Sequence, residues 1–304
     1  MRKKNADVVS VELRGGLGNQ LFGLSAGWLI SSKLQWGLNL DGRYLRWQGS
    51  NSNRSLELDK FNFSVNQNLS FNKSLPGLAR LNLIRKWILR LDHVWRKVRD
   101  VSSVNGDWHN LLEIEKVARK TGKIQGSFMD FRWASEAQKY GFPKRLDLKS
   151  TSARVYNLLD EVSKSCAVHI RLTDFLDYPG VFPKLSNLYF DSAILEMSKS
   201  GFSKFTVFTD DLELARDLYP SVFQGKDIFI IPNSLSTTET FFLMQSCAGI
   251  ISASSSFSSW AAFFIANQGG PVICPNKLLL DNSPDPRPTA WLRLDYASGS
   301  KDIE

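Results

Sequence analysis

The second half of the chain alternates between continuous apolar runs and helix-like patterns. The apolar runs are predicted as strands and cover residues 166–172, 204–210, 228–232, 249–254 and 271–275. Segments with helical spacing of their apolar residues lie between them, at 188–199, 212–219, 238–247 and 257–268. Strands that are apolar at nearly every position are typical of a parallel sheet covered by helices on both faces. The pattern therefore predicts a doubly wound α/β domain.

The first half of the chain opens in the same style. Its expected elements are a strand at 8–13, a helix at 19–33, a strand at 37–41, a short helix at 133–140 and a connecting helix at 143–165. At 304 residues the chain is longer than most single hydrophobic cores allow. We therefore expect two domains, residues 1–150 and 151–304, whose Rossmann-like parallel sheets face a central cleft. Ligands of such sheets bind outside the carboxyl ends of the strands.

The composition, with 43% apolar and 22% charged residues, is that of an ordinary globular protein. No run approaches the ~20 apolar residues that span a bilayer, and the first residues lack the apolar segment of a signal peptide. Cys166, Cys247 and Cys274 lie in apolar stretches and form no C-x-x-C, which indicates buried free thiols in a reducing compartment. These features predict a cytoplasmic protein.

The formal net charge of +8 favours a polyanionic partner, which could be nucleic acid, an anionic membrane surface or a phosphate-bearing substrate. Residues 79–100 contain seven Lys or Arg against two Asp, and their apolar residues recur at three- and four-residue steps. This spacing predicts a basic amphipathic helix. Such a helix either packs its apolar face on its own domain or lies on the anionic inner face of a membrane.

A glycine-rich turn, Gly15-Gly16-Leu17-Gly18-Asn19-Gln20, joins the first predicted strand to the first predicted helix. Glycine permits a positive φ and lets another group approach the backbone closely. The start of a helix presents unpaired N–H groups that suit an anion. The turn therefore either holds an anionic ligand or is simply a tight connection.

Polar residues follow the strand predicted at 166–172. His169 and Arg171 lie on the same side of this strand, because side chains alternate. An arginine that leaves a buried strand is expensive to desolvate without an anion, and its planar fork matches phosphate oxygens. The alternatives are an Arg171–Asp174 ion pair that only ties down the loop, and a core role for His169.

Two further strand ends carry polar groups. Asp210 and Asp211 precede a predicted helix, where they could hydrogen-bond a nucleoside or cap the helix. Ser254-Ser255-Ser256-Phe257-Ser258 enters another predicted helix, and its hydroxyl and amide groups could form a second anion cradle. Helix capping alone would need only one of these serines.

The motifs that are missing are also informative. No D-x-D is present, so a nucleotide diphosphate would be met by Arg171, backbone amides and helix dipoles in place of a divalent metal. The chain also lacks a Walker-type G-x-x-x-x-G-K-[ST] and the third glycine of a dinucleotide fingerprint at 16–21. These absences argue against an ATPase and a NAD enzyme.

The order of the motifs resembles that of the α-1,2-fucosyltransferase family. GGLGNQLF at 15–22 is similar to the opening motif of that family, and HIRLTD at 169–174 resembles its H-x-R-R-x-D segment. FTDD at 208–211 resembles F-S-D-D, and IISASSSFSSWAAFF at 250–264 resembles I-x-A-N-S-[ST]-F-S-W-W-G-A-W. The resemblance spans nearly the whole chain.

This resemblance implies a two-domain GT-B-like fold, GDP-fucose as donor, a glycan acceptor and inversion at the anomeric carbon, without a metal or another cofactor. It implies α-1,2 transfer to galactose. Arg171 would bind the β-phosphate, and we nominate Asp174 as the base that deprotonates the acceptor, although Asp174 could instead orient Arg171. The donor-binding residues would be Gly16, Gly18, Asn19, Gln20, His169, Arg171, Asp210, Asp211, Ser255, Ser256, Phe257 and Ser258.

The chain also departs from the family pattern. Leu172 replaces the second Arg of H-x-R-R-x-D, Ser254 replaces the Asn of A-N-S, and Ser259-Trp260-Ala261 replaces Trp-Trp-Gly. Two other classes of protein stay open, one because a cation is lost at Leu172 and one because of the net charge of +8 and the basic segment 79–100. The first is a non-catalytic relic that binds a nucleotide sugar. The second is a basic protein that binds a membrane or nucleic acid.

Overall fold

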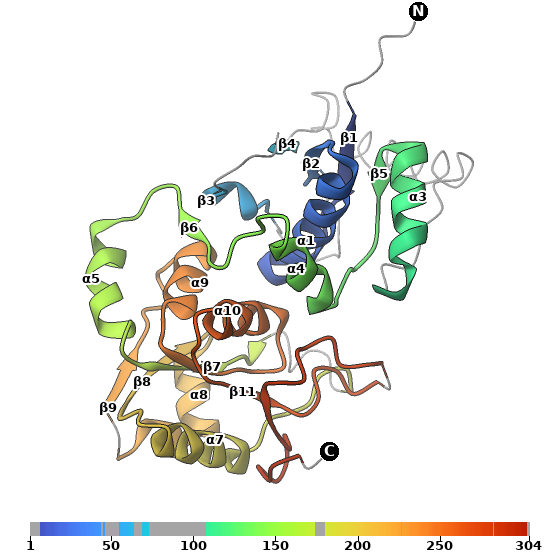
Figure 1. Cartoon of the computed structure of the whole chain (residues 1–304). Helices are drawn as coiled ribbons and strands as arrows, with labels where there is room; N and C mark the ends of the chain where they lie inside the picture. Colours follow the sequence, from blue (N-terminus) through green and yellow to red (C-terminus); the bar gives the residue numbers. More distant parts are fainter. Residues whose placement is uncertain are drawn as a thin grey trace, which may run out of the picture. The chain divides into compact units, whose positions relative to one another are not determined.

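The structure is a computed structural model of the whole chain, and it describes residues 7–43, 45, 55–63, 69–72, 108–173, 180–225, 227–281 and 283–302. The chain divides into two compact units (Figure 1). The first unit contains residues 1–59 and 64–142, and the second contains 60–63 and 143–304. Residues 143–150, which were expected in the first domain, thus cluster with the second unit.

The first unit is built on a small parallel sheet. In chain order its main elements are β1 (Val8–Glu12), α1 (Leu17–Leu34), β2 (Gly37–Asp41), β4 (Leu69–Asn72), α3 (Leu111–Thr121), β5 (Lys123–Ile124) and α4 (Phe131–Gln138). The strand order is β4-β2-β1-β5, and every pair is parallel. The chain steps outward from β1 to β2 and β4 and then returns to the other side of β1, so the order reverses between β1 and β5.

Helix α1 lies very close to this sheet because it carries a glycine at the point of contact. A Cβ on Gly27 would stand 2.5 Å from Val11 Cγ2 and 2.8 Å from Leu38 Cδ1, which belong to β1 and β2. Nearly every residue of α1 is buried, and the helix also packs against α4. The turn between β1 and α1 is therefore fixed at both ends by buried elements.

The second unit contains a six-stranded parallel sheet. Its elements are β3 (Phe61–Asn62), β6 (Asp147–Leu148), α5 (Ala153–Val162), β7 (Cys166–Ile170), α7 (Asn187–Lys199), β8 (Lys204–Thr209), α8 (Leu212–Leu218), β9 (Asp227–Ile230), α9 (Thr237–Gln245), β10 (Gly249–Ile251), α10 (Ser256–Ala266), β11 (Val272–Pro275) and β12 (Leu292–Leu294). The strand order is β12-β11-β10-β7-β8-β9, and β3 pairs separately with β6 in antiparallel fashion. Numbered from β7, this is the 3-2-1-4-5-6 order of a Rossmann sheet, which reverses between β7 and β10.

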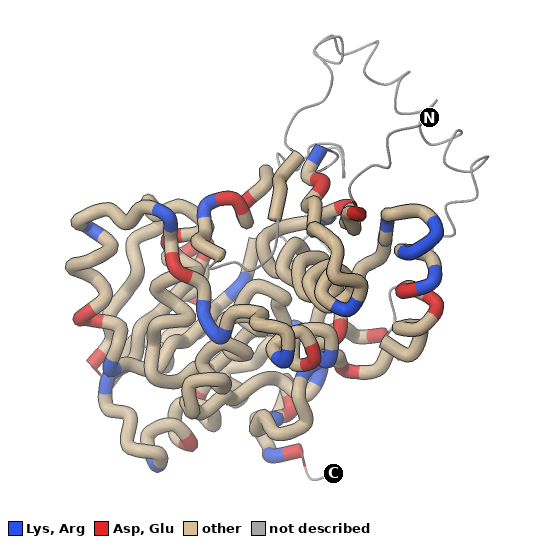
Figure 2. The backbone as a smooth tube through the Cα atoms, turned by 45° about the horizontal axis from the view of Figure 1, so that its top comes forward, with Lys and Arg blue, Asp and Glu red and all other residues tan. Residues whose placement is uncertain are grey.

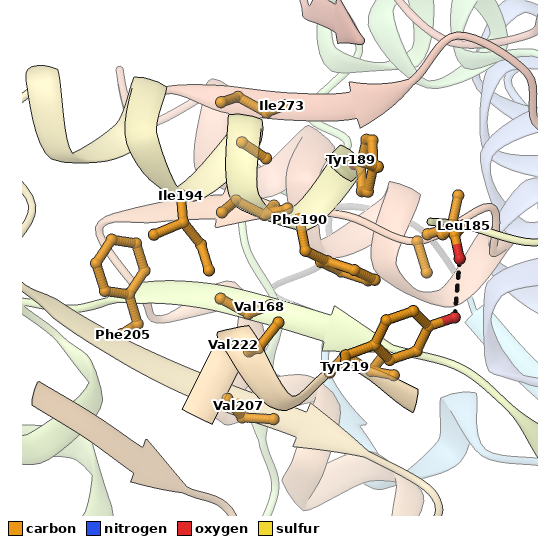
Figure 3. Close-up of a cluster of buried hydrophobic side chains, with 14 of the residues drawn as sticks. Val168, Leu185, Tyr189, Phe190, Ile194, Phe205, Val207, Tyr219, Val222 and Ile273 are labelled. Atoms are coloured by element: carbon orange, nitrogen blue, oxygen red, sulfur yellow. Dashed lines mark hydrogen bonds between the residues drawn. The ribbon is translucent and has the colours of Figure 1, made fainter. Parts of the chain in front are cut away.

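One face of this sheet carries a hydrophobic core, part of which Figure 3 shows. Alternate residues of β7 and the turn after it face α7 there: Cys166, Val168, Ile170 and Leu172. Two tyrosine hydroxyls in this core donate to backbone carbonyls, Tyr219 to Leu185 at 3.0 Å and Tyr189 to Ser252 at 2.7 Å. Burial raises the pKa of both phenols, so they stay protonated as donors.

The predicted α/β fold with parallel sheets is confirmed, and each strand and helix predicted between 166 and 275 is present with ends shifted by a few residues. The predicted connecting helix at 143–165 is wrong in part, because the segment forms β6 and the shorter α5. Helix α3 and strand β12 were not predicted. The three cysteines are free and buried, as expected.

The predicted basic helix at 79–100 lies outside the described residues. This segment supplies five of the eight net positive charges, since it has seven Lys or Arg and two Asp. Along the described part of the chain, basic and acidic positions are interspersed (Figure 2). No helix among the described residues combines the length and the apolar content that crossing a bilayer requires.

Candidate active site

In the turn that follows β7, one residue packs into the hydrophobic core and the arginine before it faces away from the core. Because side chains alternate, Ala167, His169 and Arg171 face away from the core cluster that contains Ile170 and Leu172. Leu172 is 3% exposed, whereas the Arg171 side chain is 29% exposed. Leucine at position 172 thus fills a core site, and a cation there would have to be buried on the opposite side from Arg171.

The Arg171 guanidinium is held by a carboxylate from the neighbouring strand end. Its Nη1 lies 3.1 Å from Oδ2 of Asp210. The same carboxylate accepts hydrogen bonds from the backbone N–H groups of Leu172 at 3.0 Å and Thr173 at 3.1 Å, and from the Thr173 hydroxyl at 2.5 Å. We call these four residues, Arg171, Leu172, Thr173 and Asp210, the Asp210 clamp.

The protonation of Asp210 follows from these contacts. Partial burial by itself would raise the pKa of this carboxyl group. The hydrogen bond from Thr173, the charge of Arg171 and the two backbone N–H groups together outweigh burial and lower the pKa below its usual value of 3.8. Asp210 is therefore an anion at neutral pH, and its oxygens are engaged within the protein.

Asp211 has a different position from its neighbour. It is the N-cap of α8 and accepts a hydrogen bond from the backbone N–H of Leu214 at 3.1 Å. This is the helix-capping use that the sequence left open. The two adjacent carboxylates, which were predicted to serve one nucleoside, thus have separate structural partners, and their roles in donor binding stay predictions.

His169 is 5% exposed and lies among aromatic rings. Its ring centroid is 5.9 Å from that of Phe257, and Phe257 is 5.2 Å from Phe241. Phe257 belongs to the first turn of α10, so His169 connects the end of β7 to the start of this helix. The structure thus brings together His169 and Phe257, two of the predicted site residues.

The serines after β10 have mostly structural partners. Ser255 is the N-cap of α10 and accepts from the N–H of Phe257 at 3.3 Å. Ser258 donates to the carbonyls of Ala253 and Ser255, and Ser254 donates to Lys277. Ser256 is partly exposed. The predicted anion cradle therefore rests on the free N–H groups at the start of α10 and on Ser256 more than on the other hydroxyls.

In the first unit, the glycine turn after β1 contains a residue in the left-handed conformation. Gly15 has a φ of +63°, and a Cβ there would lie 2.5 Å from the Asn19 side-chain nitrogen. Gly16 is the N-cap of α1 and Gly18 is buried in the first turn of that helix. Glycine is favoured at position 15, because the left-handed backbone disfavours a side chain and a Cβ would force the Asn19 amide to shift.

Asn19 and Gln20 were predicted together, but the structure separates their roles. Gln20 is fully buried; its Nε2 donates to the carbonyls of Gly15 at 3.2 Å and Ser55 at 2.9 Å, and its Oε1 accepts from the N–H of Glu57 at 3.0 Å. Asn19 is partly exposed, and its amide has no hydrogen-bond partner among the described residues. Asn19 is thus available to a ligand, whereas Gln20 holds the turn together.

Asp174, the nominated base, lies outside the described residues. Thr173 was missed by the sequence reasoning, because its contact with Asp210 depends on the register of β7 and β8. Among the described residues, no group of three or more His, Cys, Asp or Glu side chains could hold a metal ion.

Residues 143–283 match the family model of glycosyl transferase family 11. The matched segment lies within the second unit. It contains β7, β8, β10 and the helices between them, and therefore includes the Asp210 clamp, His169 and the serine turn.

Two curated relatives from Escherichia coli extend this likeness over most of the chain. An alpha-1,2-colitosyltransferase is 25% identical over 95% of this chain and 99% of its own length. The O-antigen biosynthesis glycosyltransferase WbnK is 23% identical over 89% of this chain and 95% of its own length. The protein is thus similar to bacterial glycosyltransferases along nearly all of its sequence.

The fold is also similar to that of a solved fucosyltransferase. NodZ from Bradyrhizobium has a TM-score of 0.53 and 18% sequence identity, and the match covers 85% of this chain and 92% of NodZ. The predicted GT-B-like α/β class is thereby confirmed. The chain thus shares the fold of a solved fucosyltransferase, and its residues 143–283 match a glycosyl transferase family.

Proposed function

We propose that the protein transfers L-fucose from GDP-fucose to a hydroxyl group of a glycan acceptor, in α-1,2 linkage to galactose, with inversion and without a metal ion. The observation that carries the proposal is the position of Arg171. It leaves β7 where the strand order of the six-stranded sheet reverses, and ligands of such sheets bind at this edge.

The transfer reaction requires a cation that stabilises the departing diphosphate. As the bond between the anomeric carbon and the β-phosphate oxygen breaks, GDP takes the electron pair and negative charge grows on that phosphate. A guanidinium has five N–H donors in a planar fork, so its contact with Asp210 is compatible with a bidentate phosphate contact. Removal of one such preorganised donor costs roughly 10²–10³ in rate.

The acceptor hydroxyl must lose its proton as it attacks the opposite face of the anomeric carbon. A carboxylate near the phosphate-binding arginine is the natural base. We propose Asp174 for this role, three residues after Arg171, with orientation of Arg171 as its alternative role. One-step attack from the face opposite the leaving group accounts for inversion.

The relatives bear on the sugar and the acceptor. Colitose is fucose without its 3-hydroxyl group, so the alpha-1,2-colitosyltransferase supports a 6-deoxy sugar of this shape and an α-1,2 linkage. The name of WbnK supports an acceptor of the bacterial O-antigen type. A site that hydrogen-bonds the 3-hydroxyl would reject colitose by a large factor, whereas a site that merely tolerates it would accept both sugars.

The test is turnover by the purified full chain with a galactose-terminated oligosaccharide acceptor and one donor at a time: GDP-fucose, GDP-colitose, GDP-mannose or UDP-galactose. We expect multiple turnovers with GDP-fucose that persist in EDTA, and NMR of the product should show an α-1,2 bond. Binding of GDP-fucose without turnover would favour a non-catalytic relic. Activity only with GDP-colitose would correct the donor, and loss of activity in EDTA would correct the metal independence.

A further inference from the structure

The Asp210 carboxylate receives donors from three consecutive residues of the turn after β7. Oδ1 accepts from Leu172 N–H, and Oδ2 accepts from Thr173 N–H and the Thr173 hydroxyl and forms an ion pair with Arg171 Nη1, at distances between 2.5 and 3.1 Å. Both oxygens are thus used to shape one turn and to hold one side chain. A carboxylate with so many internal donors is poorly suited to bind a nucleoside as well.

The register of the sheet builds this arrangement into the fold. β7 and β8 run parallel, with Ile170 opposite Thr209. The next residue of each strand is therefore Arg171 beside Asp210, at the same edge of the sheet. Leu172 adds to this by packing into the core, because its buried side chain fixes the turn from the other face.

We propose that Asp210 and Thr173 are positioning residues that hold the Arg171 guanidinium at the edge of the sheet, ready for the β-phosphate of the donor. The inference rests on the proposed function, in which Arg171 meets the diphosphate. It replaces the expectation that Asp210 binds the nucleoside. An arginine side chain has many rotamers, and a partner that already selects one of them removes that ordering step from binding and from the reaction.

The two roles for Asp210 predict different changes in nucleotide affinity when Asp210 is removed. If Asp210 positions Arg171, its removal weakens binding of GDP, which has a β-phosphate, and leaves GMP, which has none. If Asp210 contacts the nucleoside, its removal weakens both ligands by the same factor. Isothermal titration calorimetry of the full chain with GDP and with GMP therefore separates the two roles.

The variants are Asp210→Asn, Thr173→Val, Thr173→Ser and, as a matched control, Asp217→Asn, which removes an exposed carboxylate from α8. We expect Asp210→Asn to weaken the affinity for GDP by about tenfold or more, because a hydrogen bond to a charged group is lost. The affinity for GMP should change by less than about twofold. Thr173→Val should weaken GDP by a smaller factor, and Thr173→Ser should restore it because the hydroxyl returns. Asp217→Asn should match the natural chain.

Equal weakening of GDP and GMP in Asp210→Asn would overturn the positioning role, and so would natural GDP affinity in Thr173→Val. Circular dichroism and the melting temperature show whether Asp210→Asn is folded; if it is not, the pair of Thr173 variants decides the question. Arg171→Ala separates this inference from the proposed function. If Arg171→Ala binds GDP as tightly as the natural chain, both the proposed function and the positioning role are wrong. If Arg171→Ala binds GDP more weakly but Asp210→Asn binds it as tightly as the natural chain, only the positioning role is wrong.

Discussion

The turns after β1 and after β7 occupy equivalent places in two different sheets. Each turn leaves a central strand beside the point where the strand order reverses, and each contains residues predicted to bind the donor. The turn after β1 is shaped by Gly15 with a φ of +63° and by the buried amide of Gln20. The turn after β7 is shaped by the charged Asp210 clamp.

The difference shows two ways to preorganise a site. In the turn after β1, the backbone conformation itself is the functional feature, so added side-chain atoms should disturb the site. In the turn after β7, a positioned charge is the functional feature, so the removal or neutralisation of a polar group should disturb the site. The turn after β7 should therefore respond to changes of charge and pH, and the turn after β1 to changes of volume and of buried hydrogen bonds.

The largest expected effect is on catalysis and comes from Arg171→Ala. Turnover with GDP-fucose should fall by roughly 10²–10³, because a preorganised donor to the leaving group is lost. Asp210 keeps its contacts to Leu172 and Thr173, so the melting temperature should change little. Arg216→Ala, which removes an exposed arginine of α8, is the control. A rate within twofold of the natural chain would exclude Arg171 from the mechanism.

The next effect is on stability and compares two buried glutamines. Gln20→Ala leaves the carbonyls of Gly15 and Ser55 and the N–H of Glu57 without their partner, which costs about 3 kcal/mol. Gln245→Ala in the second unit removes two buried hydrogen bonds to the backbone of Leu146. Calorimetric melting should show a loss of roughly 5 °C or more for both variants.

Only Gln20→Ala should also weaken donor binding beyond what its stability loss explains, because it loosens the glycine turn. The assay is donor affinity at a temperature at which both variants are folded. Equal donor affinity in the two variants would show that the glycine turn has no part in the donor site.

A smaller effect is expected from adding one methyl group. Gly15→Ala and Gly225→Ala both place a Cβ on a left-handed residue, with φ of +63° and +68°. This conformation costs about 1–2 kcal/mol in either position. Only at Gly15 does the methyl group also meet Asn19, since nothing lies within 4 Å at Gly225. We therefore expect similar losses in melting temperature, with reduced turnover in Gly15→Ala alone.

The smallest effect concerns pH and the second turn. The pKa of Asp210 is lower in the folded protein than its usual 3.8, so its contribution to stability is present above that value and is lost as the pH falls through the folded pKa. Urea unfolding between pH 7 and pH 5 should therefore show no difference in slope against pH between the natural chain and Asp210→Asn. A difference should appear only below about pH 4. A difference that appears near neutral pH would contradict the lowered pKa.

The sequence was sufficient for the order of strands and helices in the second unit, because continuous apolar runs with helices between them have few other solutions. It also located the two turns. It did not distinguish the role of Asn19 from that of Gln20, or the role of Asp210 from that of Asp211. Adjacent residues of similar chemistry differ in the direction of their side chains, which only the folded structure shows. The burial of Leu172 follows from strand alternation and could have been read from the sequence, whereas the Thr173 contact needed the register of β7 and β8.

The short segment Lys60–Phe63 belongs to the second unit although it lies far from it in sequence. Its strand β3 pairs with β6, and the buried ring of Phe61 is 6.1 Å from that of Phe241. A fragment that began at 143 would thus lack one partner strand and expose an aromatic face. Chimeras that exchange this unit between relatives therefore need three junctions, at 59/60, 63/64 and 142/143.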